Sequence, residues 1–479
     1  MTGVGIQVTQ DVLRFVFLVY TALVVTHFVL QVGFAHSAWR RSVARGKAEA
    51  DLEQAAYLPS VDVIVPVYNE DPKALDACCR ALAGQDYKGQ LRVYLIDDGS
   101  ANRAALLEVY RRYRPRRDWR VLLADTNAGK RAAQDLAYRR GRGDLVVTID
   151  SDTEVSPDGI STIVGVFRDP KVGAVTGNVG VSNFSENLLT RLIGMRYWLA
   201  FNQERAAQGR FGAVLCCSRP FSVYRREALD TVWEAYTTQT FRGVACTYGD
   251  DRHLTNLILA EGYHTVYEPR ADARTNVPTK MRTYLHQQLR WNKSYYRELL
   301  WTFPFLFKRP PYLIFDVLTQ TLLPLLLTAA VVSAVASAIL VSPVSLLRYV
   351  AAITLMAMLH VGYAVWRTPR PAVRPVRELR VPARRAAHPA ARAGAVHADR
   401  QPLGHPPPGQ GHGQDAGGHR EIRRHLPAHQ LLCRKRVEHI GTPPETVALC
   451  APRARSSTSP NSHPCTGRRR TERVATAPC

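Results

Sequence analysis

The chain has 479 residues, a length sufficient for two or three domains, and a formal net charge of +23. Residues 367–479 hold 21 basic and seven acidic residues, so +14 of this charge lies there, and the charge does not predict nucleic acid as a partner. Much of the remainder lies beside apolar segments, where a basic bias indicates the cytoplasmic surface of a membrane. The nine Cys include no CxxC pair and no spacing typical of secreted proteins, which favours reduced thiols in a domain that faces the cytosol.

An apolar segment at residues 12–35 is long enough to cross a bilayer as a helix. No small-residue cleavage site follows it, so we expect a membrane anchor and not a signal peptide. Trp39, Arg40 and Arg41 come next and predict that the chain beyond them lies in the cytoplasm. A buried helix of a soluble protein is the alternative, which the length of the segment disfavours.

From residue 61 onward, apolar runs typical of strands alternate with helical patterns. Regular alternation of this kind predicts an α/β domain with a mostly parallel sheet and helices on both faces. The run that begins at Leu145 is rich in β-branched residues and ends at Asp150, as expected for a strand buried on both faces. Strands are expected at 61–67, 91–97, 119–124 and from 145, and helices at 73–85, 102–112 and 130–140.

Polar residues stand where three of the expected strands end. They are Asn69 and Glu70 after the first strand, Asp97 and Asp98 after the second, and Asp150 and Asp152 after the fourth. The carboxyl ends of parallel strands meet at one edge of the sheet, so these residues predict a crevice for a ligand. Two carboxylates one residue apart suit a hard divalent cation that keeps phosphate oxygens among its ligands. The alternative for Asp150 and Asp152 is an Asp/Ser cap on a following helix.

The same edge offers the groups that a nucleotide sugar requires for its base, ribose and diphosphate. Asp97 or Asp98 can accept hydrogen bonds from the base or the ribose. Lys130 stands at the start of an expected helix and can approach a phosphate with help from the helix N-terminus. Asp150 and Asp152 suit the sugar and the metal. For Lys130 alone, a solvated side chain in an ordinary turn is the alternative.

Two motifs further along the chain add candidate catalytic groups. Asp250 and Asp251 open an expected helix, where either carboxylate can act as a general base, although an acidic first turn is also a common helix cap. Gln287, Arg290 and Trp291 lie in a stretch with helical spacing, in which Arg290 offers a planar fork for phosphate and Trp291 a flat face for a sugar ring. For this stretch alone, an amphipathic surface helix at the membrane interface is the favoured interpretation.

The order of these motifs resembles that of the processive members of glycosyltransferase family 2, which include cellulose, chitin and hyaluronan synthases. The motifs are Asp97-Asp98, Asp150-Ser151-Asp152, Gly249-Asp250-Asp251 and Gln287-x-x-Arg290-Trp291, between membrane segments. Closer similarity, to bacterial hyaluronan synthases and to the nodulation chitin-oligosaccharide synthases, lies in segments 197–208, 216–227, 249–256 and 280–298. The strings RWNKSYYRE and GDDR favour the hyaluronan synthases, whereas FGAVLCC and YWLA favour the nodulation enzymes. The resemblance covers about residues 61–305.

The resemblance implies an inverting transferase whose cytoplasmic GT-A (Rossmann-like) domain covers residues 61–275, with interfacial helices at 276–310. Asp152 and the donor diphosphate would hold Mg²⁺ or Mn²⁺, and Asp251 would deprotonate the acceptor hydroxyl. The roles of holding the acceptor and the leaving diphosphate would fall to Gln287, Arg290 and Trp291. Family members usually have Gly where this chain has Arg219, and that difference alters the geometry expected at the acceptor sugar.

The activity implied by the resemblance is that of a multi-pass plasma-membrane synthase, with membrane lipid and a growing glycan chain as partners. It would polymerise UDP-N-acetylglucosamine together with UDP-glucuronate, as hyaluronan synthases do. One alternative is a chitin or chito-oligosaccharide synthase that uses UDP-N-acetylglucosamine alone, and another is an inactive remnant that lacks its last membrane span. A transferase that adds one sugar to a lipid carrier is disfavoured, since such enzymes generally lack the motif at 287–291.

Two more apolar segments, 322–341 and 346–366, can cross a bilayer and return. Related synthases usually continue with a further apolar segment and a Trp-Gly-Thr-Arg motif, whereas residues 367–479 are rich in Arg, Pro, Ala, Gly and His. This composition predicts disorder. With one choice of codons for residues 398–408, a shift of one nucleotide reads Leu-Thr-Asp-Asn-Arg-Trp-Gly-Thr-Arg-Arg, so we also interpret the tail as translated out of frame.

Overall fold

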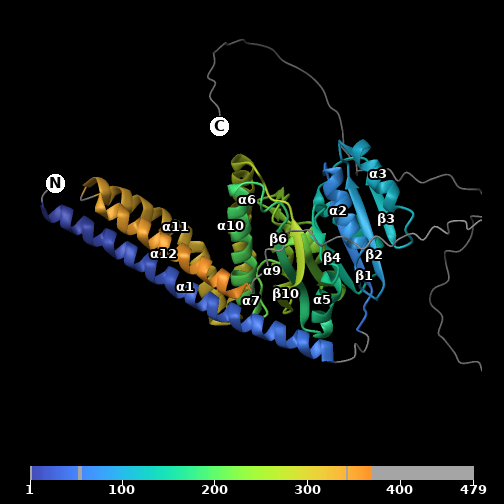
Figure 1. The fold of residues 1–479 in the computed structure, drawn as a ribbon, viewed down its shortest axis with the longest axis horizontal. Coiled ribbons are helices and arrows are strands. Elements are labelled where there is room, and N and C mark those ends of the chain that lie inside the picture. Colours follow the sequence, from blue (N-terminus) through green and yellow to red (C-terminus); the bar gives the residue numbers. More distant parts are fainter. Residues whose placement is uncertain (1–2, 52–56, 341–342, 369–479) are drawn as a thin grey trace, which may run out of the picture. The chain divides into compact units, whose positions relative to one another are not determined.

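The computed structural model describes residues 3–51, 57–340 and 343–368, so the tail expected at 367–479 lies outside the described residues except for its first two. An eight-stranded sheet with the order β3-β2-β1-β4-β7-β6-β10-β5 forms the centre of the catalytic part (Figure 1). Strands β3, β2, β1 and β4 are parallel to one another, β7 is antiparallel to β4 and β6, and β10 is parallel to β6 and antiparallel to β5. The strands are β1 (Val61–Val67), β2 (Leu91–Asp98), β3 (Trp119–Ala124), β4 (Leu145–Thr148), β5 (Glu154–Val155), β6 (Val172–Val181), β7 (Ser222–Arg225) and β10 (His264–Thr275), and β8 (Thr240–Phe241) pairs with β9 (Val244–Ala245) as a separate hairpin.

The first four strands form at the apolar runs that predict them. All seven residues of β1 are buried, as expected for a strand with parallel neighbours on both sides. Asp62 is the charged residue within β1, and Arg92 and Arg226 each place a guanidinium nitrogen 3.0 Å from one of its carboxylate oxygens. These two ion pairs satisfy the buried charge, so the strand can keep a carboxylate in the core.

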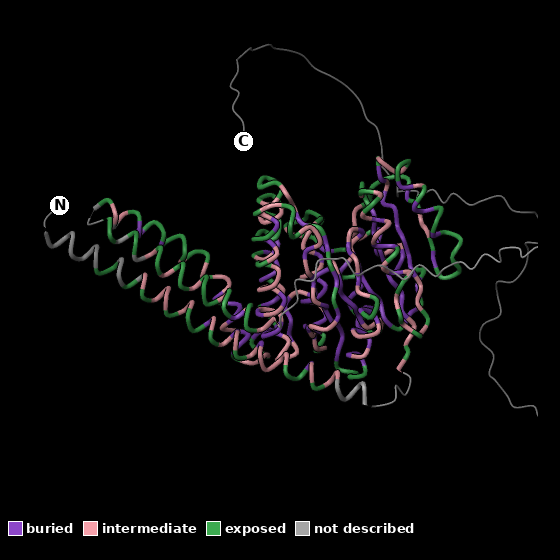
Figure 2. The backbone as a smooth tube through the Cα atoms, viewed as in Figure 1, coloured by how far each residue is buried: buried purple, intermediate pink, exposed green. Residues whose placement is uncertain are grey.

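Helices cover the sheet, and the burial pattern shows which surfaces they bury (Figure 2). In α2, the buried residues Leu75, Cys78, Cys79 and Leu82 recur at helical spacing. This helix begins at Pro72, and the Asp71 side chain accepts a hydrogen bond from the Ala74 N–H group at 3.2 Å. The helices are α2 (Pro72–Ala83), α3 (Arg103–Tyr113), α4 (Lys130–Arg140), α5 (Gly159–Gly165), α6 (Leu188–Leu199), α7 (Ala206–Gly209), α8 (Arg226–Thr237), α9 (Asp250–Ala260) and α10 (Met281–Leu306), with a π-helical turn at Ala200–Arg205 and 3-10 turns at Val166–Arg168 and Arg219–Phe221.

Three further helices are long and apolar enough to cross a membrane: α1 (Gly3–Asp51), α11 (Pro311–Leu340) and α12 (Val344–Arg367). Their candidate spans are Phe17–Gly46, Pro311–Ala336 and Tyr349–Arg367, with mean hydropathies of 1.8, 1.8 and 1.5. Many large apolar side chains on α11 and α12 are exposed, which suits contact with lipid. The described residues therefore form an α/β domain with candidate membrane helices on both sides of it in the sequence.

A buried polar cluster joins two of these helices to the catalytic part. Asp316 on α11 is fully buried, and its carboxylate lies 2.7 Å from His27 Nε2 of α1. Gln208 of α7 donates a hydrogen bond to the other oxygen of Asp316 at 2.8 Å. Polar residues within spans are retained when they are paired, so this cluster fixes α1 and α11 against α7.

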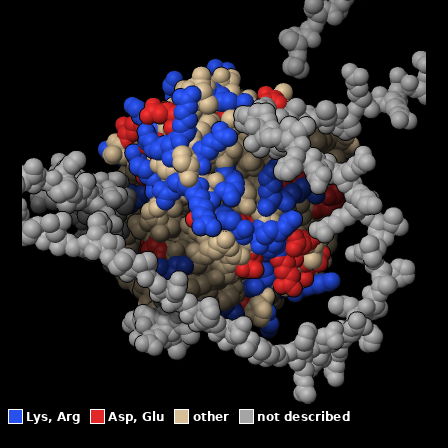
Figure 3. All heavy atoms as spheres, turned by 90° about the vertical axis from the view of Figure 1, so that its right-hand side faces the viewer, with Lys and Arg blue, Asp and Glu red and all other residues tan. Residues whose placement is uncertain are grey.

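Exposed basic side chains also gather over the end of the catalytic domain that carries α3 and β3 (Figure 3). They include Arg111, Arg114, Arg116, Arg117 and Arg120. The sequence predicts that much of the positive charge of the first 366 residues lies beside apolar segments, and these side chains lie away from them. They form a second basic surface, on α3, β3 and the turn that joins them.

Candidate active site

A cavity of about 350 Å³ lies at the carboxyl ends of β1, β2 and β4. This is the edge at which the sequence predicts a ligand crevice, and α4 begins beside it. Its lining residues are Pro66, Val67, Tyr68, Glu70, Asp98, Asn127, Gly129, Lys130, Asp150, Ser151 and Asp152. Five of the eleven are Asp, Glu or Lys, so the cavity suits a charged ligand better than an apolar one.

Asp98 shapes the turn that leads into α4. Its two carboxylate oxygens accept hydrogen bonds from the N–H groups of Ala128 and Gly129, each at 2.9 Å. Gly129 has a φ of 91°, which a residue with a side chain rarely adopts. Burial raises the pKa of Asp98, and the two backbone hydrogen bonds oppose that rise. Asp98 therefore holds the turn so that Lys130 begins the helix at the cavity.

Asp97 does not line the cavity. Its carboxylate is fully buried and accepts hydrogen bonds from the Ser100 N–H group at 2.8 Å, from Arg103 at 2.9 Å and from the Tyr110 hydroxyl at 2.7 Å. Successive residues of a strand point to opposite faces, so only one of Asp97 and Asp98 can face the ligand. The structure thus assigns Asp97 to the fold of the β2–α3 turn and does not place it against a base or ribose.

Lys130 and Asp150 form an ion pair across the cavity. Burial favours the neutral acid, but the charges of Lys130 and Arg219 outweigh it and hold the pKa of Asp150 below its usual value. Burial also lowers the pKa of Lys130. A phosphate that enters this cavity would meet the ammonium group of Lys130, which is paired with the carboxylate of Asp150.

Asp152 lies in a more negative environment than Asp150. Burial and the neighbouring charges of Asp150 and Glu70 raise the pKa of Asp152 to about 6. One of its oxygens accepts a hydrogen bond from the Thr275 hydroxyl at 3.1 Å, and Ser151 donates one to Glu70 at 2.6 Å. Asp150, Asp152 and Glu70 fit a hard cation, because their carboxylates repel one another when no cation lies between them. Within the described ranges no group of three or more His, Cys, Asp or Glu forms a complete metal cage, so substrate or water oxygens would complete the shell.

Asp250 and Asp251 open α9 directly after Gly249, which has a φ of 78°. Asp250 is buried and forms an ion pair with Arg219. Asp251 is partly exposed, and one of its oxygens lies 3.5 Å from the Cys216 thiol. A Cβ atom at Gly249 would lie 1.8 Å from the Ser294 hydroxyl oxygen. This close turn against α10 therefore requires Gly.

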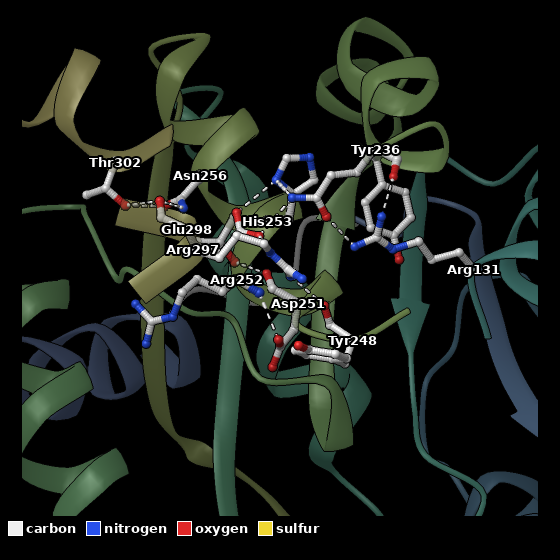
Figure 4. A network of polar contacts seen from close by, with 12 residues as sticks. Arg131, Tyr236, Tyr248, Asp251, Arg252, His253, Asn256, Arg297, Glu298 and Thr302 are labelled. Carbon is white, nitrogen blue, oxygen red and sulfur yellow. Dashed lines mark hydrogen bonds and ion pairs between the residues drawn. The ribbon is translucent and has the colours of Figure 1, made fainter. Parts of the chain in front are cut away.

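A network of buried polar side chains holds the start of α9 against α10 (Figure 4). Glu298 is its centre: one oxygen accepts from His253 Nδ1 at 2.9 Å, and the other from Gln239 at 2.8 Å and Arg297 at 3.1 Å. Arg131 of α4 donates to the side-chain oxygen of Gln239 at 2.6 Å. The network therefore connects the helix that carries Lys130 to the helix that carries Asp250 and Asp251.

Gln287, Arg290 and Trp291 lie together on α10 but are not brought into polar contact with the cavity. Gln287 is partly buried, whereas Arg290 and Trp291 are exposed. Their spacing places them along one side of the helix, where i, i+3 and i+4 positions are neighbours. Only the second half of α10, from Ser294 onward, is packed into the core.

Comparison with known proteins supplies the family. The model described as glycosyl transferase family 2 matches residues 62–233. The chain is 48% identical over 294 residues to an N-acetylglucosaminyltransferase of Neorhizobium galegae, covering 61% of this chain and 68% of the relative. It is 48% identical over 311 residues to an N-acetylglucosaminyltransferase of Sinorhizobium fredii, covering 64% of this chain and 75% of the relative. It is 44% identical over 326 residues to one of Rhizobium meliloti, covering 68% of this chain and 75% of the relative.

The chain belongs to glycosyltransferase family 2. It is therefore a glycosyltransferase, as the order of the sequence motifs predicts. Among solved structures, a mannosyltransferase from Pyrobaculum calidifontis in complex with GDP-Man and Mn²⁺ has a TM-score of 0.49 and 20% sequence identity, covering 72% of this chain and 94% of that one.

Three features of this family 2 site have no role among the catalytic, substrate-binding and metal-binding residues that the sequence predicts. Glu70 lines the cavity, and its position after β1 was already a signal, because it ends a strand beside Asp98 and Asp150. Arg219 is buried against Asp250, and its loop is held by Arg205, which donates to the Ser218 hydroxyl at 2.6 Å. The Glu298 network carries no sequence signal, because its members come from four separated elements.

Proposed function

We propose that this family 2 transferase moves N-acetylglucosamine from UDP-N-acetylglucosamine to the end of a glycan chain with inversion. The observation that carries the proposal is the cavity that brings Lys130, Asp150 and Asp152 together at the strand ends. The named activity of the relatives supports the sugar, since three of them are N-acetylglucosaminyltransferases with 44–48% identity.

In this proposal the cavity binds the donor. Asp98 holds the turn that faces the nucleotide, and Lys130 meets the diphosphate at the N-terminus of α4, where helix N–H groups also favour anions. Asp152, with Asp150 nearby, would hold Mg²⁺ or Mn²⁺, and the cation would supply positive charge for the leaving diphosphate. Burial and the charges of Asp150 and Glu70 raise the pKa of Asp152, and this crowding of carboxylates supports a cation at this position.

Asp251 is the proposed general base for the acceptor hydroxyl. Asp250 is less suited to the role, because its carboxylate is buried and is already engaged in an ion pair with Arg219. Asp251 keeps partial access to solvent. Gln287, Arg290 and Trp291 would hold the acceptor and the leaving diphosphate, which requires α10 or the glycan to bring them toward the cavity.

The second donor distinguishes two products. The names of the relatives support N-acetylglucosamine as a donor sugar, which is consistent with chitin oligosaccharide synthesis, whereas the sequence of α10, with RWNKSYYRE, favours the hyaluronan type that also uses UDP-glucuronate. Membranes that contain the protein should be incubated with each labelled UDP-sugar, alone and paired. Product from UDP-N-acetylglucosamine alone that chitinase digests supports the first type, and product that needs both donors and is digested by hyaluronidase supports the second.

The proposed location is the plasma membrane, with several crossings and the catalytic domain in the cytoplasm. Support comes from the three candidate spans and from Arg40, Arg41 and Arg45 at the catalytic end of the α1 span. An inactive remnant remains the alternative to a synthase. Donor binding without product from either sugar pair in the membrane assay would favour the remnant.

A further inference from the structure

A second cavity, of about 380 Å³, lies where α1 meets the catalytic domain. Four stretches of the chain contribute to it: the end of the α1 span, the residues just before β6 and at its start, the turn after α7, and the start of β10. It shares no lining residue with the donor cavity. Its lining residues are Ala38, Arg41, Arg45, Asp169, Val172, Gly209, Arg210, Phe211, Gly212, His264, Val266 and Tyr267.

Positive charge dominates this cavity. Arg41, Arg45 and Arg210 line it, against the single carboxylate of Asp169. Like charges that line one cavity repel one another, and a bound anion would relieve that repulsion. The balance of charge therefore predicts an anionic ligand.

Two of these guanidinium groups have no carboxylate partner in the described part of the chain. Arg41 donates to the Arg210 carbonyl oxygen at 2.9 Å, and Arg210 donates through Nε to the Ser37 hydroxyl at 3.3 Å. Each guanidinium has five N–H donors in a planar fork, so both retain donors for another acceptor. Arg45 differs, because it pairs with the buried Glu268 at 3.3 Å. Arg41 and Arg210 thus form the part of the cavity that is available to bind an anion.

The cavity lies at the level expected for lipid headgroups. Arg41 and Arg45 fall within the last residues of the candidate span that ends at Gly46. Trp39 is beside them on α1, and the Arg367 guanidinium at the end of α12 lies 4.1 Å from the Trp39 ring centroid. Trp and Arg side chains concentrate where a membrane meets water.

We propose that this cavity binds the phosphate of an anionic phospholipid headgroup. Guanidinium groups bind phosphate oxygens in a bidentate manner, and Phe211 and Val266 give the same cavity apolar walls for the start of the acyl chains of a lipid. A soluble phosphate ester has the same recognised group but would not use the interfacial position. The lipid would join α1 to the turn after α7. Gln208, within α7, contacts Asp316 on α11.

The test uses full-length protein in detergent, with bound lipid counted by native mass spectrometry. Phosphatidylglycerol should bind on the order of tenfold tighter than phosphatidylcholine, and the double variant Arg41→Gln/Arg210→Gln should lose this preference. Arg40→Gln/Arg117→Gln is the matched control, because both residues are exposed, neither lines the cavity, and the charge change is the same. Arg41→Lys/Arg210→Lys should keep most of the preference.

Three outcomes would overturn the proposal. They are equal binding of the two lipids by the unmodified protein, an equal loss in the control variant, and displacement of phosphatidylglycerol by inorganic phosphate at the same concentration, which would assign the cavity to soluble phosphate esters. If the double Gln variant does not fold, Ala38→Trp replaces it, because Trp at this lining position fills the cavity without changing its charge. Retained preference for phosphatidylglycerol in Ala38→Trp would also contradict the proposal.

Discussion

Glu298 and His253 are 45 residues apart in the chain, yet Glu298 Oε2 and His253 Nδ1 lie 2.9 Å apart in the core. Both side chains are almost completely buried. An ionised carboxylate can only accept, so Nδ1 carries the proton that His253 donates. The pair fixes α9 to α10 one helical turn after Asp250 and Asp251, and so couples the packing of the core to the position of the proposed base.

Glu298→Gln should lower the free energy of unfolding by roughly 3 kcal/mol, because it removes the charge from a buried pair and leaves the charge of Arg297 uncompensated. Thermal unfolding of the purified protein measures the change. Glu227→Gln is the control, since Glu227 is exposed on α8. Equal unfolding temperatures for the two variants would show that the Glu298 network does not stabilise the fold.

The effect of Glu298→Gln should not shrink between about pH 7 and about pH 5. Burial alone would raise the pKa of Glu298, but the hydrogen bonds from His253 and Gln239 and the charge of Arg297 hold it below its usual value. A carboxylate with a lowered pKa in the fold contributes stability above its unfolded pKa of about 4.3 and loses it only as the pH falls through the lower folded value. A difference that disappears at about pH 5 would mean that Glu298 is protonated in the folded protein.

Asp152→Asn should abolish the metal-dependent part of UDP binding, because a neutral amide is a poor ligand for a hard cation that has few other protein ligands. Calorimetry with UDP, with and without Mn²⁺, measures this part. Asp158→Asn, an exposed residue before α5, serves as the control. Mn²⁺-dependent affinity that is unchanged in Asp152→Asn would remove Asp152 from the proposed metal site.

Asp251→Asn should leave UDP-sugar binding intact and lower turnover on the order of 10²-fold or more, as expected for the loss of a general base. Asp250→Asn should act differently, by destabilising the loop that contains its partner Arg219. Unfolding temperature and turnover, measured on both variants, separate the two roles. Turnover that persists in Asp251→Asn but is lost in a folded Asp250→Asn would reverse the assignment.

The first four strands could be predicted because polar residues bound each apolar run, and β1 is in addition buried on both faces. Val61–Val67 and Trp119–Ala124 have the predicted bounds. The start of α11 was harder to predict, since Asp316 interrupts the apolar character before residue 322. The helix nevertheless begins at Pro311, because His27 and Gln208 satisfy the Asp316 carboxylate from other parts of the chain.

The candidate site was predictable as a set of strand ends but not as a set of contacts. Asp97 and Asp98 are equivalent in the sequence, and only the direction of the side chains on β2 separates a core residue from a cavity residue. Likewise, Arg219 was recognised as unusual, but its ion pair with Asp250 depends on the packing of a turn against α9. Long-range side-chain contacts of this kind have no local pattern.

Arg219 and Asp250 should be energetically coupled. Both side chains are largely buried, so the loss of either partner leaves a charge in the core without its counter-ion. Arg219→Gly and Asp250→Asn alone should each lower the free energy of unfolding by about 3 kcal/mol. The double variant should lose less than the sum of the two, with a coupling of about 1–3 kcal/mol.

A double-mutant cycle measures this coupling from the thermal unfolding of the four proteins. Arg219→Lys is the matched variant, because it keeps the positive charge on a shorter side chain. Arg219 also lowers the pKa of Asp150 through its charge, so UDP binding should be measured in the same set. Because Asp150 stays paired with Lys130, donor affinity in Arg219→Gly should change by less than about tenfold, while acceptor use and product length change more. Additive losses of stability would show that the two residues act independently. A loss of donor affinity that exceeds the effect on acceptor use would instead place Arg219 with the diphosphate.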